Sequence, residues 1–160
     1  MTDLDRASGH PRSTASIAGH PVHPMLIPFP IACFVLTFGA DLMYGATTDP
    51  FFATASIWLL GIGLVFAALA AIAGLTDYIG DHRIRAIGDA TKHMIANVTA
   101  VVLEAVNLFL RLGDRGAIAN TGTIISGVVV LILLYSGWKG WELVYRHGVG
   151  TRPRSDGDVA

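Results

Sequence analysis

Four long apolar stretches constrain the fold of this chain more than any other feature of its sequence. About 20 consecutive apolar residues are needed for a helix to cross the roughly 30 Å hydrocarbon core of a bilayer. Residues 24–40, 51–76 and 117–138 contain no charged side chain. A fourth stretch, residues 94–110, is interrupted only by Glu104. We therefore expect an all-α membrane protein with four transmembrane helices.

The composition agrees with a chain that meets lipid over most of its surface. Hydrophobic residues make up 52% of the 160 residues and charged residues only 14%, against about a quarter charged in a typical soluble domain. The mean hydropathy is +0.56. Membrane lipid is thus the expected partner, and a net charge of −1 argues against nucleic acid. The single cysteine, Cys33, lies inside a predicted helix and excludes an intramolecular disulfide.

The length predicts one domain, flanked by polar tails. We expect disordered tails at residues 1–17 and 151–160, with a four-helix transmembrane domain at 18–150 between them. The predicted spans cover about residues 24–45, 51–77, 92–111 and 117–145. Short connections follow spans one and three, so these neighbours must run antiparallel and the four spans form an antiparallel bundle.

The basic residues orient this bundle in the membrane. One side holds both termini and the connection between spans two and three, and it carries nine basic residues: Arg6, Arg12, Arg83, Arg85, Lys92, Lys139, Arg146, Arg152 and Arg154. The opposite side has only Arg111 and Arg115. Cytoplasmic loops carry the excess of Lys and Arg. Both termini are therefore predicted to be cytoplasmic, in a multi-pass protein.

The histidines gather on the same predicted side. The six are His10, His20, His23, His82, His93 and His147. One interpretation is that they cap turns or meet lipid headgroups. The other is that at least two of them share a ligand or a proton.

The second interpretation leads to a specific cofactor site. Four-helix bundles build such sites from side chains on facing helices, and His93 opens span three on a rigid helix. We predict that His93 binds a b-type haem or a single metal ion, with His147 as the first-choice second ligand and His23 as the second choice. His20 is a further candidate, and Asn97, one turn from His93, is placed to orient the imidazole.

A polar stripe runs along span three. At 100° per residue its members project within an arc of about 80°; they are His93, Asn97, Glu104, Asn107 and Arg111. A carboxylate near mid-bilayer costs at least ~2.5 kcal/mol on insertion scales. We expect Glu104 to face the interior in its uncharged form. It serves either as structural glue that hydrogen-bonds its neighbours or as part of a proton path with Asn107 and Asp77.

Prolines make the start of span one irregular. In the run GHPVHPMLIPFPI, Pro28 and Pro30 lack the amide hydrogens that the carbonyls of Pro24 and Leu26 would otherwise accept. Irregular backbone at membrane depth is tolerated where it is buried in protein or lines a cavity. A proline-kinked anchor without a further role is the commoner explanation of such a run.

Several of these segments together resemble a known family. The run GHPVHPMLIPFPI, the GLTDYI after span two, the pair His93 and Asn97, and the closing SGWKGWELVYRHGVG are similar to bacterial domain-of-unknown-function family 2231. The similarity covers about residues 18–150. It implies a small four-helix protein of the bacterial inner membrane and no particular activity. Glu104, Lys139 and Trp141 depart from the pattern of this family.

Three functions remain open on these observations. The first is an electron-transfer subunit that holds haem or a metal ion and meets a redox protein; the resemblance favours it, because some relatives look to be joined to redox modules. The second is proton or ion transport through a homo-oligomer that uses Glu104. The third is a ligand-free accessory or scaffold protein. An enzyme is least expected, because the sequence holds no nucleophile and base pair or phosphate loop.

Overall fold

Four helices in the structure are long and apolar enough to cross a membrane. The computed structural model describes residues 11 and 13–151, and the rest of both predicted polar tails lies outside these residues. The candidate spans are Val22–Thr47, Pro50–Gly80, Gly88–Gly113 and Thr121–Tyr145. The predicted all-α four-helix fold is confirmed. The cytoplasmic placement of the termini stays a prediction.

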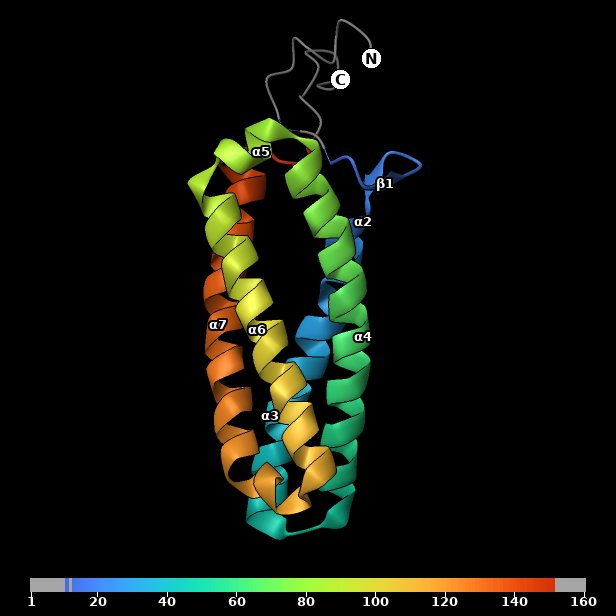
Figure 1. Ribbon diagram of the computed structural model, residues 1–160, viewed down its shortest axis with the longest axis vertical. Helices are drawn as coiled ribbons and strands as arrows, with labels where there is room; N and C mark the ends of the chain where they lie inside the picture. Colours follow the sequence, from blue (N-terminus) through green and yellow to red (C-terminus); the bar gives the residue numbers. More distant parts are fainter. Residues whose placement is uncertain (1–10, 12, 152–160) are drawn as a thin grey trace, which may run out of the picture.

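The helices form an elongated bundle (Figure 1). They are α2 (Val22–Leu26), α3 (Pro28–Thr47), α4 (Pro50–Gly80), α5 (His82–Ala86), α6 (Gly88–Gly113), the 3-10 helix η1 (Arg115–Ala119) and α7 (Thr121–Tyr145). We call the end that holds α5 and both ends of the described chain the terminal end. The end that holds η1 and the α3–α4 turn is the far end.

The long helices form two antiparallel hairpins. α3 packs along α4, and α6 packs along α7; the hairpins then meet through α4 against α6 and α3 against α7. At the far end, the Asp49 carboxylate accepts a hydrogen bond from the Phe51 amide, and Pro50 opens α4. This is a favoured helix start, because Asp satisfies a free amide and proline has no amide hydrogen to lose.

The prolines divide the first span into two helices. α2 ends at Leu26 and α3 begins at Pro28, with Ile27 between them. The Ile27 amide still donates to the His23 carbonyl at 3.1 Å, so the chain direction changes little. α2 carries His23, and the irregular backbone therefore lies next to this histidine, as expected from the proline run.

A short segment before α2 folds over the terminal end. β1 (Ser16–Ile17) pairs with β2 (His20–Pro21) across Ala18 and Gly19, both at positive φ, as a two-residue hairpin turn with the right twist requires. Asp77, near the end of α4, accepts hydrogen bonds from Ser13 Oγ and the Ala15 amide. The Asp77 carboxylate thus connects Ser13 and Ala15, within the predicted polar tail, to the end of α4.

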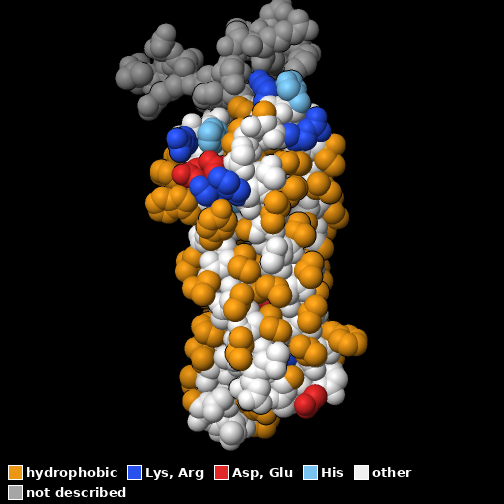
Figure 2. All heavy atoms as spheres, turned by 60° about the vertical axis from the view of Figure 1, so that its left-hand side comes forward, with side chains coloured by type: hydrophobic (Ala, Val, Ile, Leu, Met, Phe, Trp, Pro, Cys, Tyr) orange, Lys and Arg blue, Asp and Glu red, His pale blue; other side chains and the backbone are white. Residues whose placement is uncertain are grey.

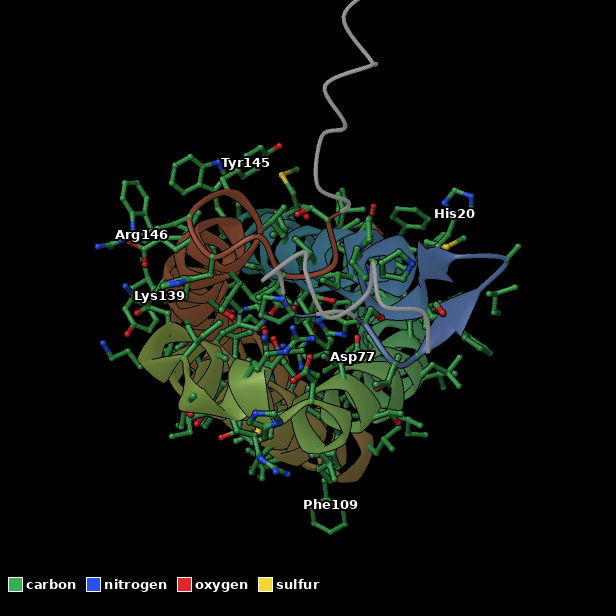
Figure 3. All side chains as sticks on the ribbon, turned by 90° about the horizontal axis from the view of Figure 1, so that it is seen from above. His20, Asp77, Phe109, Lys139, Tyr145 and Arg146 are labelled. Atoms are coloured by element: carbon green, nitrogen blue, oxygen red, sulfur yellow. The ribbon has the colours of Figure 1, made fainter. Side chains whose placement is uncertain are left out.

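The outer surface of the bundle is apolar along its length. Trp58 on α4, Phe109 on α6 and Leu131 on α7 are each at least 66% exposed. Figure 2 shows hydrophobic side chains from one end of the bundle to the other, with Lys, Arg and His side chains gathered at the terminal end. In Figure 3, Phe109 points away from the bundle. Such a surface suits lipid, not water.

Candidate functional site

The interior of the bundle has three layers. Near the terminal end lie His23 and His93, which we call the histidine pair. An apolar layer follows, made of Phe34, Leu60, Ala67, Ala100 and Val129. Towards the far end lies a fully buried set that we call the far polar cluster: Asp41, Ser56, Glu104, Asn107, Arg111 and Ser126. Polar chemistry thus occurs at two depths, with apolar packing between them.

The histidine pair joins the two hairpins. The ring centroids of His23 and His93 lie 6.2 Å apart, with an interplanar angle of 89°. His23 Nδ1 lies 2.7 Å from the Ala70 carbonyl of α4, and His93 Nδ1 lies 2.8 Å from the Ser136 carbonyl of α7. A carbonyl only accepts, so each Nδ1 carries the hydrogen and each Nε2 keeps a free electron pair.

Each ring also rests on a glycine of the second helix in its hairpin. Gly74 follows Ala70 by one turn, and a Cβ there would lie 2.8 Å from His23 Nδ1. Gly140 follows Ser136 by one turn, and a Cβ there would lie 3.1 Å from His93 Cε1. The same arrangement of carbonyl and glycine therefore positions both imidazoles.

The histidines also begin a repeat of 70 residues in the first helices of the two hairpins, although the carbonyl and glycine positions of α4 and α7 are 66 residues apart. Three buried residues of α3 follow His23, and three buried residues of α6 follow His93 at the same spacings. The corresponding residues, α3 first, are Phe34 and Glu104, Thr37 and Asn107, and Asp41 and Arg111. From each histidine to its charged residue is 18 residues, or five helical turns, so both lie on one helix face. α3 and α6 run in the same direction (Figure 1). The hairpins are thus related by an approximate two-fold axis along the bundle, as in membrane proteins with parallel repeats.

Asn97 contacts the pair from α6. Its Nδ2 lies 3.0 Å from His93 Nε2. Because the Nδ1 hydrogen of His93 is directed to Ser136, this Nε2 accepts from the Asn97 amide. Asn97 thus contacts the nitrogen that a metal would need, whereas the partner that orients a ligating histidine binds its other nitrogen. That place is taken by the Ser136 carbonyl, so the orienting role expected of Asn97 stays a prediction.

The other predicted histidines lie elsewhere on the terminal end. His147 follows α7, and its Nε2 is 3.5 Å from Asp89 Oδ2 at the start of α6. His20 belongs to β2 and is exposed; Figure 3 places it at the periphery. Within the described chain the ring next to His93 is that of His23, the second-choice partner, and not that of His147, the first choice.

Arg111 is the centre of the far polar cluster. Its Nη1 and Nη2 bind the two oxygens of Asp41 at 2.7 and 2.6 Å. Nη1 also donates to Ser56 Oγ, Nη2 to Ser126 Oγ and Nε to Asn107 Oδ1, each at 2.9 Å. The sequence analysis counted Arg111 among the basic residues of the far side and in the polar stripe of span three, and it did not pair Arg111 with Asp41. The signal that could have linked Asp41 and Arg111 is that each follows a histidine, His23 or His93, by 18 residues.

Glu104 lies at the border of the apolar layer. Its Oε2 accepts a hydrogen bond from Asn107 Nδ2 at 2.9 Å. Its Oε1 is buried and has no hydrogen-bond partner in the described chain. Asp77, the third residue of the predicted proton path, lies at the terminal end with Ser13 and Ala15, beyond the apolar layer.

Comparison with known sequences assigns the chain to a family. The pattern of DUF2231, described as a predicted membrane protein, matches residues 19–153. The chain belongs to the DUF2231 family. The match spans the histidine pair, the far polar cluster and all four candidate spans of this DUF2231 protein. No curated protein and no solved structure matches it.

Proposed function

We propose that this DUF2231 protein is an electron-transfer subunit of the bacterial inner membrane that binds a b-type haem between His23 and His93. The observation that carries the proposal is the shared placement of the two rings. Each Nδ1–H donates to a backbone carbonyl of the neighbouring helix, the contact that typically fixes the tautomer of a ligating histidine and leaves Nε2 for the metal.

The distance between the ring centroids is compatible with two histidines that bind one metal ion. A haem would in addition require the helices around the rings to open for its macrocycle. Imidazoles that share a metal have ring nitrogens about 4 Å apart, because each bond is near 2.0–2.1 Å, and their centroids are then roughly 6 Å apart. The centroids of His23 and His93 lie 6.2 Å apart. A T-shaped pair at this distance is also an ordinary aromatic contact. The spacing therefore supports the proposal together with the hydrogen bonds, and not by itself.

The donor set favours haem over a single bare metal ion. Among the described residues no group of three or more His, Cys, Asp or Glu side chains could hold a metal ion. A bare ion bound in a closed site needs about four ligands, whereas haem iron takes four from its macrocycle and needs only two from the protein. Such a haem supplies one-electron chemistry. The chain would hold it by two histidines that the repeat makes equivalent, after Asn97 gives up its contact with His93 Nε2.

The alternative of transport through Glu104 receives less support. The predicted path joined Glu104, Asn107 and Asp77. Glu104 and Asn107 are in contact, but the apolar layer lies between them and the terminal end that holds Asp77. The second alternative is a ligand-free scaffold protein, and the experiment below distinguishes it from a haem-binding protein.

A visible absorption spectrum tests the proposal. The protein, purified from cells supplied with haem precursor, should show the bands of low-spin six-coordinate haem, which sharpen on reduction with dithionite. His23→Ala and His93→Ala should each abolish these bands, because either loss removes an axial ligand. His20→Ala is the matched control and should keep them.

Two outcomes would contradict the proposal. One is a folded wild-type protein that shows no low-spin spectrum even after titration with free haem, which would favour the scaffold. The other is a spectrum lost in His147→Ala but kept in His23→Ala, which would return His147 to the role of second ligand.

A further inference from the structure

The far polar cluster contains one more acidic group than basic partners. Its only cation is Arg111, and a guanidinium has five N–H donors. Two are directed to Asp41, one to Ser56, one to Ser126 and one to Asn107. Arg111 is therefore neutralised by Asp41 and has no donor left for Glu104.

Within the part of the chain that the structure describes, Glu104 receives a single hydrogen bond. Asn107 Nδ2 donates to Oε2, while Oε1 is buried without a partner. The side chain is 0% exposed. A buried carboxylate is tolerated when it is paired and fully hydrogen-bonded. Glu104 in its ionised form would be neither.

We propose that Glu104 is a proton-binding site inside the membrane and holds a proton on Oε1 at neutral pH. Oε2 accepts from Asn107, so the hydrogen resides on the other oxygen. The charged groups near this site are Asp41 from α3 and Arg111 from α6; α4 and α7 contribute the uncharged Ser56 and Ser126. Their charges cancel, and the proton makes the cluster neutral as a whole.

This site is separate from the histidine pair and does not depend on haem. His93 precedes Glu104 by eleven residues on α6, roughly 16 Å along the helix axis. A negative result for haem binding would therefore not affect the proposal for Glu104, and a negative result for Glu104 would not affect the haem proposal.

The sequence allows a direct measurement of this proton. The chain has only two glutamates, Glu104 and Glu142, and Glu142 pairs with Lys139. Protein labelled with ¹³C at the glutamate side-chain carboxyl carbon should therefore give two NMR signals in lipid nanodiscs. At pH 7 one should have the shift of a carboxylic acid and the other that of a carboxylate. Glu142→Gln should remove only the carboxylate signal and so assign the acid without a change at Glu104.

The salt conditions separate a proton from a bound cation. In buffers with and without sodium the Glu104 signal should keep the acid shift at pH 7. Two carboxylate signals at pH 7 in sodium-free buffer would overturn the proposal. An acid signal that becomes a carboxylate on addition of sodium would overturn it in favour of a cation site. Glu104→Gln, which mimics the neutral acid, should keep the thermal unfolding temperature within a few degrees of wild type.

Discussion

Arg111 uses all five of its guanidinium N–H groups inside the bundle, and its neighbours are held in place by those bonds. The two-pronged contact with Asp41 matches the geometry in which a guanidinium binds a carboxylate best. Both side chains are 0% exposed. A buried pair of this kind adds little compared with apolar packing, but removal of one partner leaves an uncompensated charge. The main effect of the pair is therefore to specify that α3 faces α6 across the bundle, and its net contribution to the free energy of unfolding is small.

The pair gives the first stability prediction. Asp41→Asn should lower the free energy of unfolding by about 3–5 kcal/mol, because Arg111 would then be a buried, unpaired charge. Arg111→Gln should cost a similar amount. The double variant should lose less than the sum of the two single losses, since it leaves neither charge. Thermal or denaturant unfolding in detergent measures all three.

An exposed aspartate provides the control for that series. Asp49→Asn makes the same chemical change at the start of α4, where the side chain is exposed and accepts from the Phe51 amide. Asn caps a helix about as well as Asp, so the stability should stay close to wild type. Additive losses in the double variant, or an Asp41→Asn protein as stable as Asp49→Asn, would contradict the buried-pair account.

Among the helices, α4 and α7 each present a backbone surface to one of the histidine rings. Each offers a backbone carbonyl and, one turn later, a glycine. Without a Cβ at these positions, the imidazoles lie against the helix backbone itself. The long helices are thus lipid-facing on one side and closely fitted to a ring on the other.

Alanine at these glycines should displace the rings. In Gly74→Ala the new Cβ would lie 2.8 Å from His23 Nδ1, and overpacking of this kind typically costs about 1–3 kcal/mol. Gly140→Ala should cost less, because its nearest atom is 3.1 Å away. Gly61→Ala, also in α4, meets nothing within 4 Å and should be neutral or slightly stabilising. Equal unfolding free energies for Gly74→Ala and Gly61→Ala would show that the ring does not rest on this helix.

In the whole molecule, the first helices of the two hairpins run in the same direction, and one approximate two-fold axis relates the hairpins. His23 faces His93 across that axis, and Asp41 faces Arg111. Sites on such an axis are built from one residue of each repeat. This arrangement is the reason that both polar layers join the hairpins and that neither is formed by one hairpin alone.

The bundle is predicted to lie in the membrane with both termini on the cytoplasmic side. Reporter fusions after Gly45, Asp81, Asp114 and Gly150 should report outside, inside, outside and inside. The physical reason is the excess of Lys and Arg on the side of both termini. Burial of Arg111 strengthens the asymmetry, since it leaves Arg115 as the basic residue of the far surface. A periplasmic signal at Gly150 would reverse the orientation.

The membrane fold could be predicted from local features of the sequence. Helix number, antiparallel order and the helix break before Pro28 follow from local properties: the length of an apolar run, the shortness of a turn and the missing amide of a proline. The family was likewise recognisable from contiguous motifs. These features depend on residues close together in the chain, so hydropathy and spacing were enough to predict them.

The contacts between polar side chains, in contrast, depend on how the four helices pack. His93 had three candidate partners at the terminal end, and the rotation of α2 against α6 placed His23 beside it, while His147 lies near Asp89. The sequence placed Arg111 at the far end of the polar stripe, and the packing of the helices paired it with Asp41 of α3. Hydropathy specifies that a helix is in the membrane but neither its rotation nor its depth relative to another helix. Those are set by packing among all four helices, and so are the partners of His93 and Arg111.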